Sequence, residues 1–196
     1  MSAILLSLAK EILQNSPEGI SKVKFAKTIY FIFKGLVQEK LFSVEDLSFI
    51  RMPLGPVPNG FMALKNDSGL KVMEKNNGSL AYNSQVYFVS DKVNKSKLDD
   101  NQKDKIKQLT SQIEEFKTYE LVGFSHQEPS WVEFPNGTTY FLSKSDLEIK
   151  VPKKSLITKL FKKEENVNEN GRLQEQLVEG MLSDIVEEST TLEYPE

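Results

Sequence analysis

The sequence predicts an α+β fold: a predominantly helical single domain with small β-hairpins and an acidic C-terminal helical tail. Apolar residues recur at spacings of three and four in several segments, which is the period of an amphipathic helix. A stretch near the middle of the chain is rich in β-branched and aromatic residues on either side of turn residues, which favours paired strands. The 196-residue chain is 39% hydrophobic and holds 12 Phe, 6 Tyr and 1 Trp, which is enough apolar surface for one core.

Charge is divided unevenly along the chain. Residues 164–196 hold ten Asp or Glu and one Arg, a net charge of −9, whereas residues 1–163 carry about +6. Between the two parts the composition becomes lysine-rich and then Asn- and Glu-rich, as in linkers. We therefore expect a folded domain at residues 1–150, a linker at 151–172 and an acidic amphipathic tail at 173–196.

The N-terminal part of the chain is predicted to form two helices and a strand. The apolar residues from Leu5 to Leu13 share one helical face, and Asn15 to Gly19 end this helix. A longer, aromatic-rich helix starts near Ser21 and runs to Val37, and its apolar content places it in the core. Leu47 to Met52 is short, apolar and closed by a proline, which favours an extended strand.

The following part is predicted to mix strands and helices. Gly69 to Asp91 has the composition of a β-hairpin. After a polar loop, a third long helix has its apolar stripe at Ile106 to Phe116, and Tyr119 to Phe124 continues it as a short helix. Val132 to Phe141, around Asn136-Gly137, is typical of a tight two-residue hairpin.

The composition excludes several kinds of chemistry. With no cysteine and one histidine, the chain has no disulfides, no thiolate nucleophile and no zinc site built on sulfur, so no metal and no cofactor are expected. No apolar run approaches the length of a membrane span, and the N-terminus lacks the pattern of a signal peptide. We therefore expect a cytoplasmic protein that does not enter the membrane.

The first candidate functional motif is the proline- and glycine-rich stretch from Pro53 to Gly60. One interpretation is a rigid connector, because proline fixes φ and glycine permits turns. The other is a pre-ordered loop that presents its backbone at Gly55 and Pro56, together with Asn59, to a partner at little entropic cost. The stretch lacks the lysine and the spacing of a phosphate-binding loop.

The second motif runs from Ser125 to Trp131 and contains the single His and the single Trp of the chain. As a structural element, its polar side chains bond the loop backbone, Pro129 stops the preceding helix and Trp131 anchors the core. As a binding site, His126 and Glu128 form a polar rim beside the indole. As a catalytic pair these two residues supply neither a triad nor a metal set, so no catalytic residue is assigned.

The tail carries an apolar stripe in an acidic background. Leu177, Met181 and Ile185 recur at helical spacing, which predicts an amphipathic helix. A lone helix of this length is marginal in water, so it is a solvated tail, packs on its own domain or folds onto a partner. Its acidic character suits a basic protein surface.

The order of these features resembles the Panacea domain of antitoxins, a family that includes SocA-like antitoxins and phage-associated GepA-like proteins. The resemblance covers residues 20–131 and rests on Gly55-Pro56-Val57 after an extended segment and on His126, Glu128 and Trp131 after a lysine- and acid-rich helix. It implies a mainly helical domain without enzyme activity that neutralises a cognate protein toxin, encoded nearby, by direct contact. In SocA-like members it implies delivery of the toxin to a protease as an adaptor.

The residues that we expect to bind the partner therefore come from both motifs and from the tail. They are Gly55, Pro56, Asn59, His126, Glu128, Trp131, Leu177, Met181 and Ile185.

Two other functions are alternatives to this interpretation. A DNA-binding or phage-linked regulator would use the lysines between Lys92 and Lys107, but Arg51 is the single arginine before the tail, and lysine alone reads phosphates and bases poorly. Nucleic acid is therefore the weaker partner class. A hydrolase would use His126 and Glu128, and it ranks third.

Overall fold

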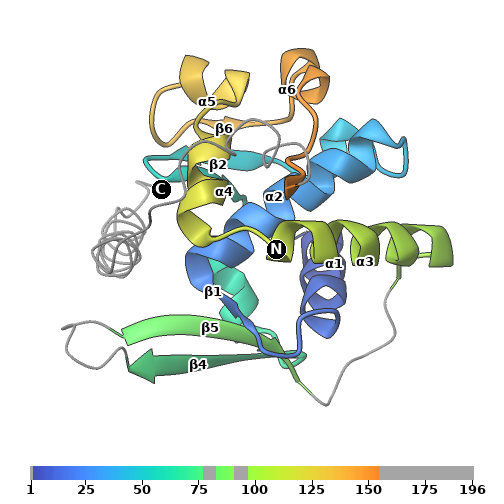
Figure 1. Cartoon of the computed structure of the whole chain (residues 1–196), viewed down its shortest axis with the longest axis vertical. Coiled ribbons are helices and arrows are strands. Elements are labelled where there is room, and N and C mark those ends of the chain that lie inside the picture. Colours follow the sequence, from blue (N-terminus) through green and yellow to red (C-terminus); the bar gives the residue numbers. More distant parts are fainter. Residues whose placement is uncertain (1, 77–82, 91–96, 155–196) are drawn as a thin grey trace.

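The computed structural model of the chain describes residues 2–76, 83–90 and 97–154. Helices dominate it, and two small antiparallel sheets complete the fold, which confirms the predicted α+β class. In Figure 1 one sheet lies at the bottom of the view and the other in its upper part, with helix α2 between them.

Two helices open the chain as predicted. In α1 (Ala3–Gln14) the side chain of the N-cap residue Ser2 accepts a hydrogen bond of 3.2 Å from the Ile4 amide, and the buried face carries the predicted leucines and Ile12. Every residue of α2 (Lys22–Gln38) from Phe25 to Val37 is buried. A helix that is buried all round belongs at the centre of a domain, and α2 contacts α1, α3, α4 and both sheets.

Two further helices pack on α2. In α3 (Asp100–Glu114) the N-cap Asp99 accepts from the Gln102 amide at 2.8 Å, and the apolar stripe is buried. The expectation that the next helix continues α3 is wrong: Lys117 has extended backbone angles and caps a separate helix, α4 (Thr118–Ser125).

The sheet at the bottom of Figure 1, here called sheet A, has the strand order β1–β5–β4. It consists of β1 (Ile20–Ser21), β4 (Leu70–Asn76) and β5 (Asn83–Val89). The last two are the strands of the predicted hairpin, paired from Leu70 with Val89 onward, and the turn between them lies outside the described residues.

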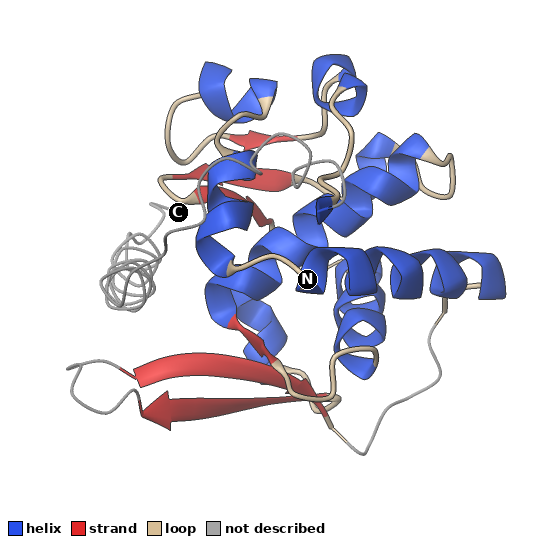
Figure 2. Ribbon diagram, in the orientation of Figure 1, coloured by secondary structure: helices blue, strands red, loops and turns tan. Residues whose placement is uncertain are grey.

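The upper sheet, called sheet B, has the order β3–β2–β6. It consists of β2 (Phe49–Met52), β3 (Gly55–Pro58) and β6 (Thr139–Tyr140). Two short helices, α5 (Pro129–Glu133) and α6 (Lys144–Glu148), lie above this sheet in the view, and 3₁₀ turns η1 (Val44–Asp46) and η2 (Phe61–Asn66) flank β2 and β3 (Figure 2).

The proline-rich stretch is only partly the loop that both interpretations of it assumed. Pro53-Leu54 and Asn59-Gly60 form turns, whereas residues 55–58 form the edge strand β3. Gly55 pairs with Met52, and Pro58 pairs with Phe49. Proline lacks the N–H that an interior strand donates, so this sequence is accommodated only because β3 lies at the edge of sheet B.

The predicted hairpin from Val132 to Phe141 is also wrong. Val132 lies in α5. Pro129 does more than stop the preceding helix, because it occupies the first turn of α5, where its missing N–H costs nothing. A turn does form at the predicted place, and Gly137 has a φ of +83°. The strand that follows it, β6, pairs with β2 and not with residues before the turn.

The remaining expectations concern the ends of the molecule. The linker beyond residue 154 and the whole tail lie outside the described residues. Among the residues that are described, no helix combines the length and the apolar character needed to cross a membrane.

Candidate functional site

The two sequence motifs meet in one buried contact, which we call the joint and define as Lys27, Gly55, Pro56 and Ser125. Gly55 has a φ of +96°, and a methyl group added to it would collide with the Ser125 hydroxyl and lie 3.0 Å from Lys27 Nζ. Lys27 Nζ donates a 2.8 Å hydrogen bond to the Pro56 carbonyl. A glycine is therefore required here both for backbone conformation and for space.

Lys27 brings an unusual group into this contact, because its side chain is only 1% exposed. In the described parts of the chain it forms no ion pair. Burial lowers the pKa of Lys27 from 10.5 to about 7, since the charged form loses its hydration without gaining a carboxylate partner. The joint is thus held by a lysine whose charge depends on pH in the neutral range.

Beside the joint, the Trp131 ring contacts one aromatic and one cationic side chain. The His126 ring stacks on the indole with centroids 4.0 Å apart and an interplanar angle of 11°, and Arg51 Cζ lies 4.2 Å from the indole centroid. The indole Nε1 donates to the Met52 carbonyl at 2.8 Å, and Arg51 bonds both the Trp131 carbonyl, at 3.2 Å, and the Asn136 side chain.

The electrostatics of His126 follow from this packing. Its pKa is lowered first by burial and then by the charges of Lys27 and Arg51, while hydrogen bonding by the Pro53 backbone raises it. The ring is therefore neutral at pH 7. Its Nε2 atom is buried and has no hydrogen-bond partner among the described residues.

Glu128 lies in the interior and not on the rim that we expected. It is 2% exposed, its two oxygens accept from Lys34 Nζ at 2.7 and 2.6 Å, and Tyr30 OH donates to it at 3.1 Å. Burial raises the pKa of Glu128, and the positive charge of Lys34 opposes that rise. This buried ion pair fastens the start of α5 to α2.

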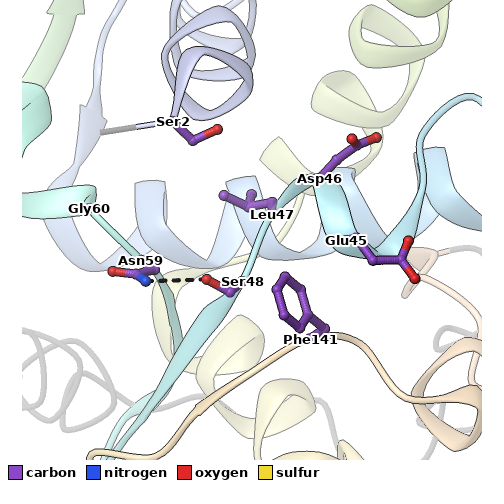
Figure 3. A pocket seen from close by; sticks show the side chains of 8 residues that line it. All are labelled: Ser2, Glu45, Asp46, Leu47, Ser48, Asn59, Gly60 and Phe141. Atoms are coloured by element: carbon purple, nitrogen blue, oxygen red, sulfur yellow. Dashed lines mark hydrogen bonds between the residues drawn. The ribbon is translucent and has the colours of Figure 1, made fainter.

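A surface pocket of about 270 Å³ opens at the end of sheet B that is remote from the joint (Figure 3). Its lining residues come from all three strand ends, η1 and the start of α1, and they are Ser2, Glu45, Asp46, Leu47, Ser48, Asn59, Gly60 and Phe141. Asn59 donates to Ser48 twice, from its amide at 2.9 Å and from Nδ2 at 3.2 Å. Sheet B therefore links the joint to this pocket.

The predicted site residues are thus divided among separate places. Gly55 and Pro56 are buried in the joint, His126 and Trp131 are half-buried in the stack, and Asn59 is exposed at the pocket. The three tail residues Leu177, Met181 and Ile185 lie outside the described residues. Sequence reasoning missed Lys27 and Arg51 as parts of this site.

The basic stretch proposed for nucleic acid is partly neutralised within the fold. Lys103 pairs with Asp100 at 3.4 Å and Lys105 with Glu39 at 2.9 Å, while residues 92–96 lie outside the described part. Within the described ranges there is also no group of three or more His, Asp or Glu side chains placed to hold a metal ion.

Comparison with known proteins gives one match. The family model described as "Antitoxin SocA-like, Panacea domain" matches residues 25–132, more than half of the chain. The matched range contains the joint, the stack and the Lys34–Glu128 pair, whereas Ser2 and Phe141 of the pocket lie outside it. No curated protein and no solved structure that was searched matches the chain.

Proposed function

Because the chain belongs to the family of SocA-like antitoxins with a Panacea domain, we propose that it neutralises a cognate protein toxin by binding it directly. The observation that carries this proposal is the joint, in which the two sequence motifs meet and β3 of sheet B is held against α2 and α4. A surface that is rigid before binding loses little conformational entropy when a partner arrives. The role proposed is therefore binding, without catalysis.

The contact surface that we propose on the domain consists of exposed residues at the end of sheet B and on α5. Val132, next to Trp131, is 66% exposed, and Phe141 is 49% exposed. Asn59 is also exposed, and the half-buried Trp131 completes the set with an aromatic and polar anchor. Gly55, Pro56 and Glu128 position this surface from the interior instead of touching the partner.

Co-expression with the products of adjacent genes tests the proposal. One such product is expected to stop growth alone and to become harmless, and to co-purify, when this chain is present. Val132→Asp should weaken the rescue, whereas Met73→Asp, at a residue that is 47% exposed on β4 of sheet A, serves as the matched control and should not. If no neighbouring product is toxic and none co-purifies, the proposal is wrong.

The amount of toxin in the rescued cells separates the two modes of neutralisation. Direct binding leaves the toxin at its normal level in an immunoblot, whereas delivery to a protease as an adaptor lowers it. We propose the first mode, because the features described here account for a binding surface.

We propose the acidic tail as a second contact with the toxin, on the basis of its net charge of −9 and its apolar stripe at Leu177, Met181 and Ile185. Deleting residues 164–196 should leave the domain folded and reduce affinity for the toxin, more strongly at low salt. An affinity that titration calorimetry finds unchanged would remove the tail from the interface.

A further inference from the structure

The pocket at the end of sheet B has an acidic and aromatic lining that the antitoxin role alone does not explain. We propose that it binds a cationic side chain, lysine or arginine, presented by the protein partner of this chain. The identity of the partner rests on the proposed function, whereas the chemistry of the pocket does not.

The charges and the ring in the lining favour a cation. Glu45 and Asp46 contribute two carboxylates, and none of the eight lining side chains is a lysine, an arginine or a histidine. The hydroxyl of Ser43 donates to Glu45 and thereby lowers the pKa of Glu45, so this carboxylate is charged at neutral pH. The half-exposed Phe141 ring also lines the pocket, and an aromatic ring attracts a cation that lies over its face.

The apolar part of the lining suits the stem of the same side chain. Leu47 lines the pocket but is only 2% exposed, so the Phe141 ring, which is 49% exposed, is the main apolar surface of the pocket. The methylene groups of lysine or arginine can pack on that ring while the charged end stays near the carboxylates. A volume of about 270 Å³ lies below the range of about 300–1,000 Å³ that is usual for small-molecule sites, so one side chain fits better than a larger ligand.

The pocket is also built before any ligand arrives. Ser48 lies between the ends of the two outer strands. The backbone N–H of Asn59 donates to the Ser48 carbonyl and fixes the backbone, and Nδ2 donates to the Ser48 hydroxyl and fixes the side chain. Because Nδ2 is the donor in one of these bonds, the side-chain oxygen of Asn59 is left as an acceptor. In Figure 3 the Phe141 ring lies with Glu45 to one side of it in this view and the Asn59–Ser48 pair to the other.

Charge argues against the chain's own tail as the occupant. Residues 164–196 carry −9, the same sign as the two carboxylates, so the pocket repels the tail and attracts a basic surface. The acidic tail is thus disfavoured, and the proposal commits to a basic segment of a separate partner as the occupant.

The test is an NMR titration of the ¹⁵N-labelled full chain with acetyl-Gly-Arg-Gly-amide as the probe. The matched control peptide replaces arginine by citrulline, which has nearly the same shape without the charge. We expect the amide signals of Ser48, Asn59 and Phe141 to shift with a Kd of about 1 mM, and the citrulline peptide to bind at least about tenfold more weakly. No shift at these amides, or equal binding of both peptides, would overturn the proposal.

Variants at exposed positions show which groups hold the probe without endangering the fold. Glu45→Gln and Phe141→Ala should each raise the Kd at least about threefold, because one removes a charge and the other the ring. Glu133→Gln, at an exposed acid on α5, is the control and should leave the Kd unchanged. Unchanged binding in both pocket variants would contradict the assignment.

The growth assay then asks whether the toxin uses the pocket. Glu45→Lys should lose rescue while Glu133→Lys retains it. Full rescue by Glu45→Lys would refute the pocket as a toxin contact while direct neutralisation still stands. If the wild-type chain rescues nothing, the proposed function fails, whereas the peptide titration, which needs no toxin, still decides the chemistry of the pocket.

Discussion

Replacing Lys27 by Met should make the stability of the domain less dependent on pH. Lys27 is buried in the joint, and burial lowers its pKa from 10.5 to about 7. Between these two values the unfolded chain holds a proton that the folded chain has released, so the free energy of unfolding rises with pH across this window. Below it both states are protonated, and the full cost of burying the charge is present.

The size of the effect follows from the width of the window. Each pH unit inside it adds about 1.4 kcal/mol to the free energy of unfolding of the wild type, and nothing to that of a variant without the amine. From about pH 7.5 to about pH 9.5, the stability of the wild type relative to Lys27→Met should therefore rise by about 2 to 3 kcal/mol. Loss of the bond to the Pro56 carbonyl costs the variant about 1 to 3 kcal/mol at every pH and does not alter this slope.

Denaturant unfolding followed by circular dichroism at several pH values measures both proteins. Tyr87, whose pKa burial raises to about 12, and the other buried tyrosines titrate alike in both, so the difference isolates Lys27. Lys65→Met removes an exposed lysine and controls for the change in net charge. A difference between wild type and Lys27→Met that is the same at both ends of the range would refute the burial argument.

Three further predictions concern the packing around the joint. Gly55→Ala should destabilise the domain by about 2 to 4 kcal/mol, because the positive φ of Gly55 and the lack of space around it both oppose a methyl group. The control Gly123→Ala, at a position where nothing lies within 4 Å, should be neutral or stabilise α4 by up to about 1 kcal/mol. Equal melting temperatures of the two variants would contradict this reasoning. Glu128→Leu should cost about 3 to 5 kcal/mol by leaving Lys34 unpaired, and adding Lys34→Met should restore most of it in a double-mutant cycle. Trp131→Phe should lower the free energy of unfolding by about 1 to 3 kcal/mol, because it removes the indole donor, and Trp131→Ala should lower it by about 3 to 5 kcal/mol. Denaturant unfolding followed by circular dichroism measures both. An unchanged stability of Trp131→Ala would make the indole a surface contact only.

Much of the fold could be predicted because its helices and the long hairpin depend on local patterns. The apolar stripes of α1 and α3 repeat with the helical period, and the strands of the 70–89 hairpin are adjacent in sequence. The errors arose where a strand has a distant partner. The Asn136-Gly137 turn is local, but β6 pairs with Phe49 and Ile50, some ninety positions earlier, and no local pattern specifies that choice.

The sequence pointed to two motifs but not to their arrangement. Gly55 and the segment around His126 were singled out as candidate binding elements, yet nothing in their spacing indicated that Gly55 touches Ser125. Glu128 was paired in sequence reasoning with its neighbour His126, while its partner Lys34 lies 94 positions away. A signal was present in α2, where Lys27 and Lys34 are seven residues apart on a helix that is otherwise apolar, and two lysines at that spacing share one face.

The two prolines of β3 determine how another protein can approach sheet B. The Asn59 amide bonds Ser48, and because hydrogen-bonded pairs alternate along an antiparallel ladder, Pro56 and Pro58 direct their backbone away from β2. That outer side therefore presents no N–H at either position, and the Pro56 carbonyl already accepts from Lys27. A further strand has too few groups to pair with here, so this edge resists self-association into extended sheets and obliges any partner to bind through side chains.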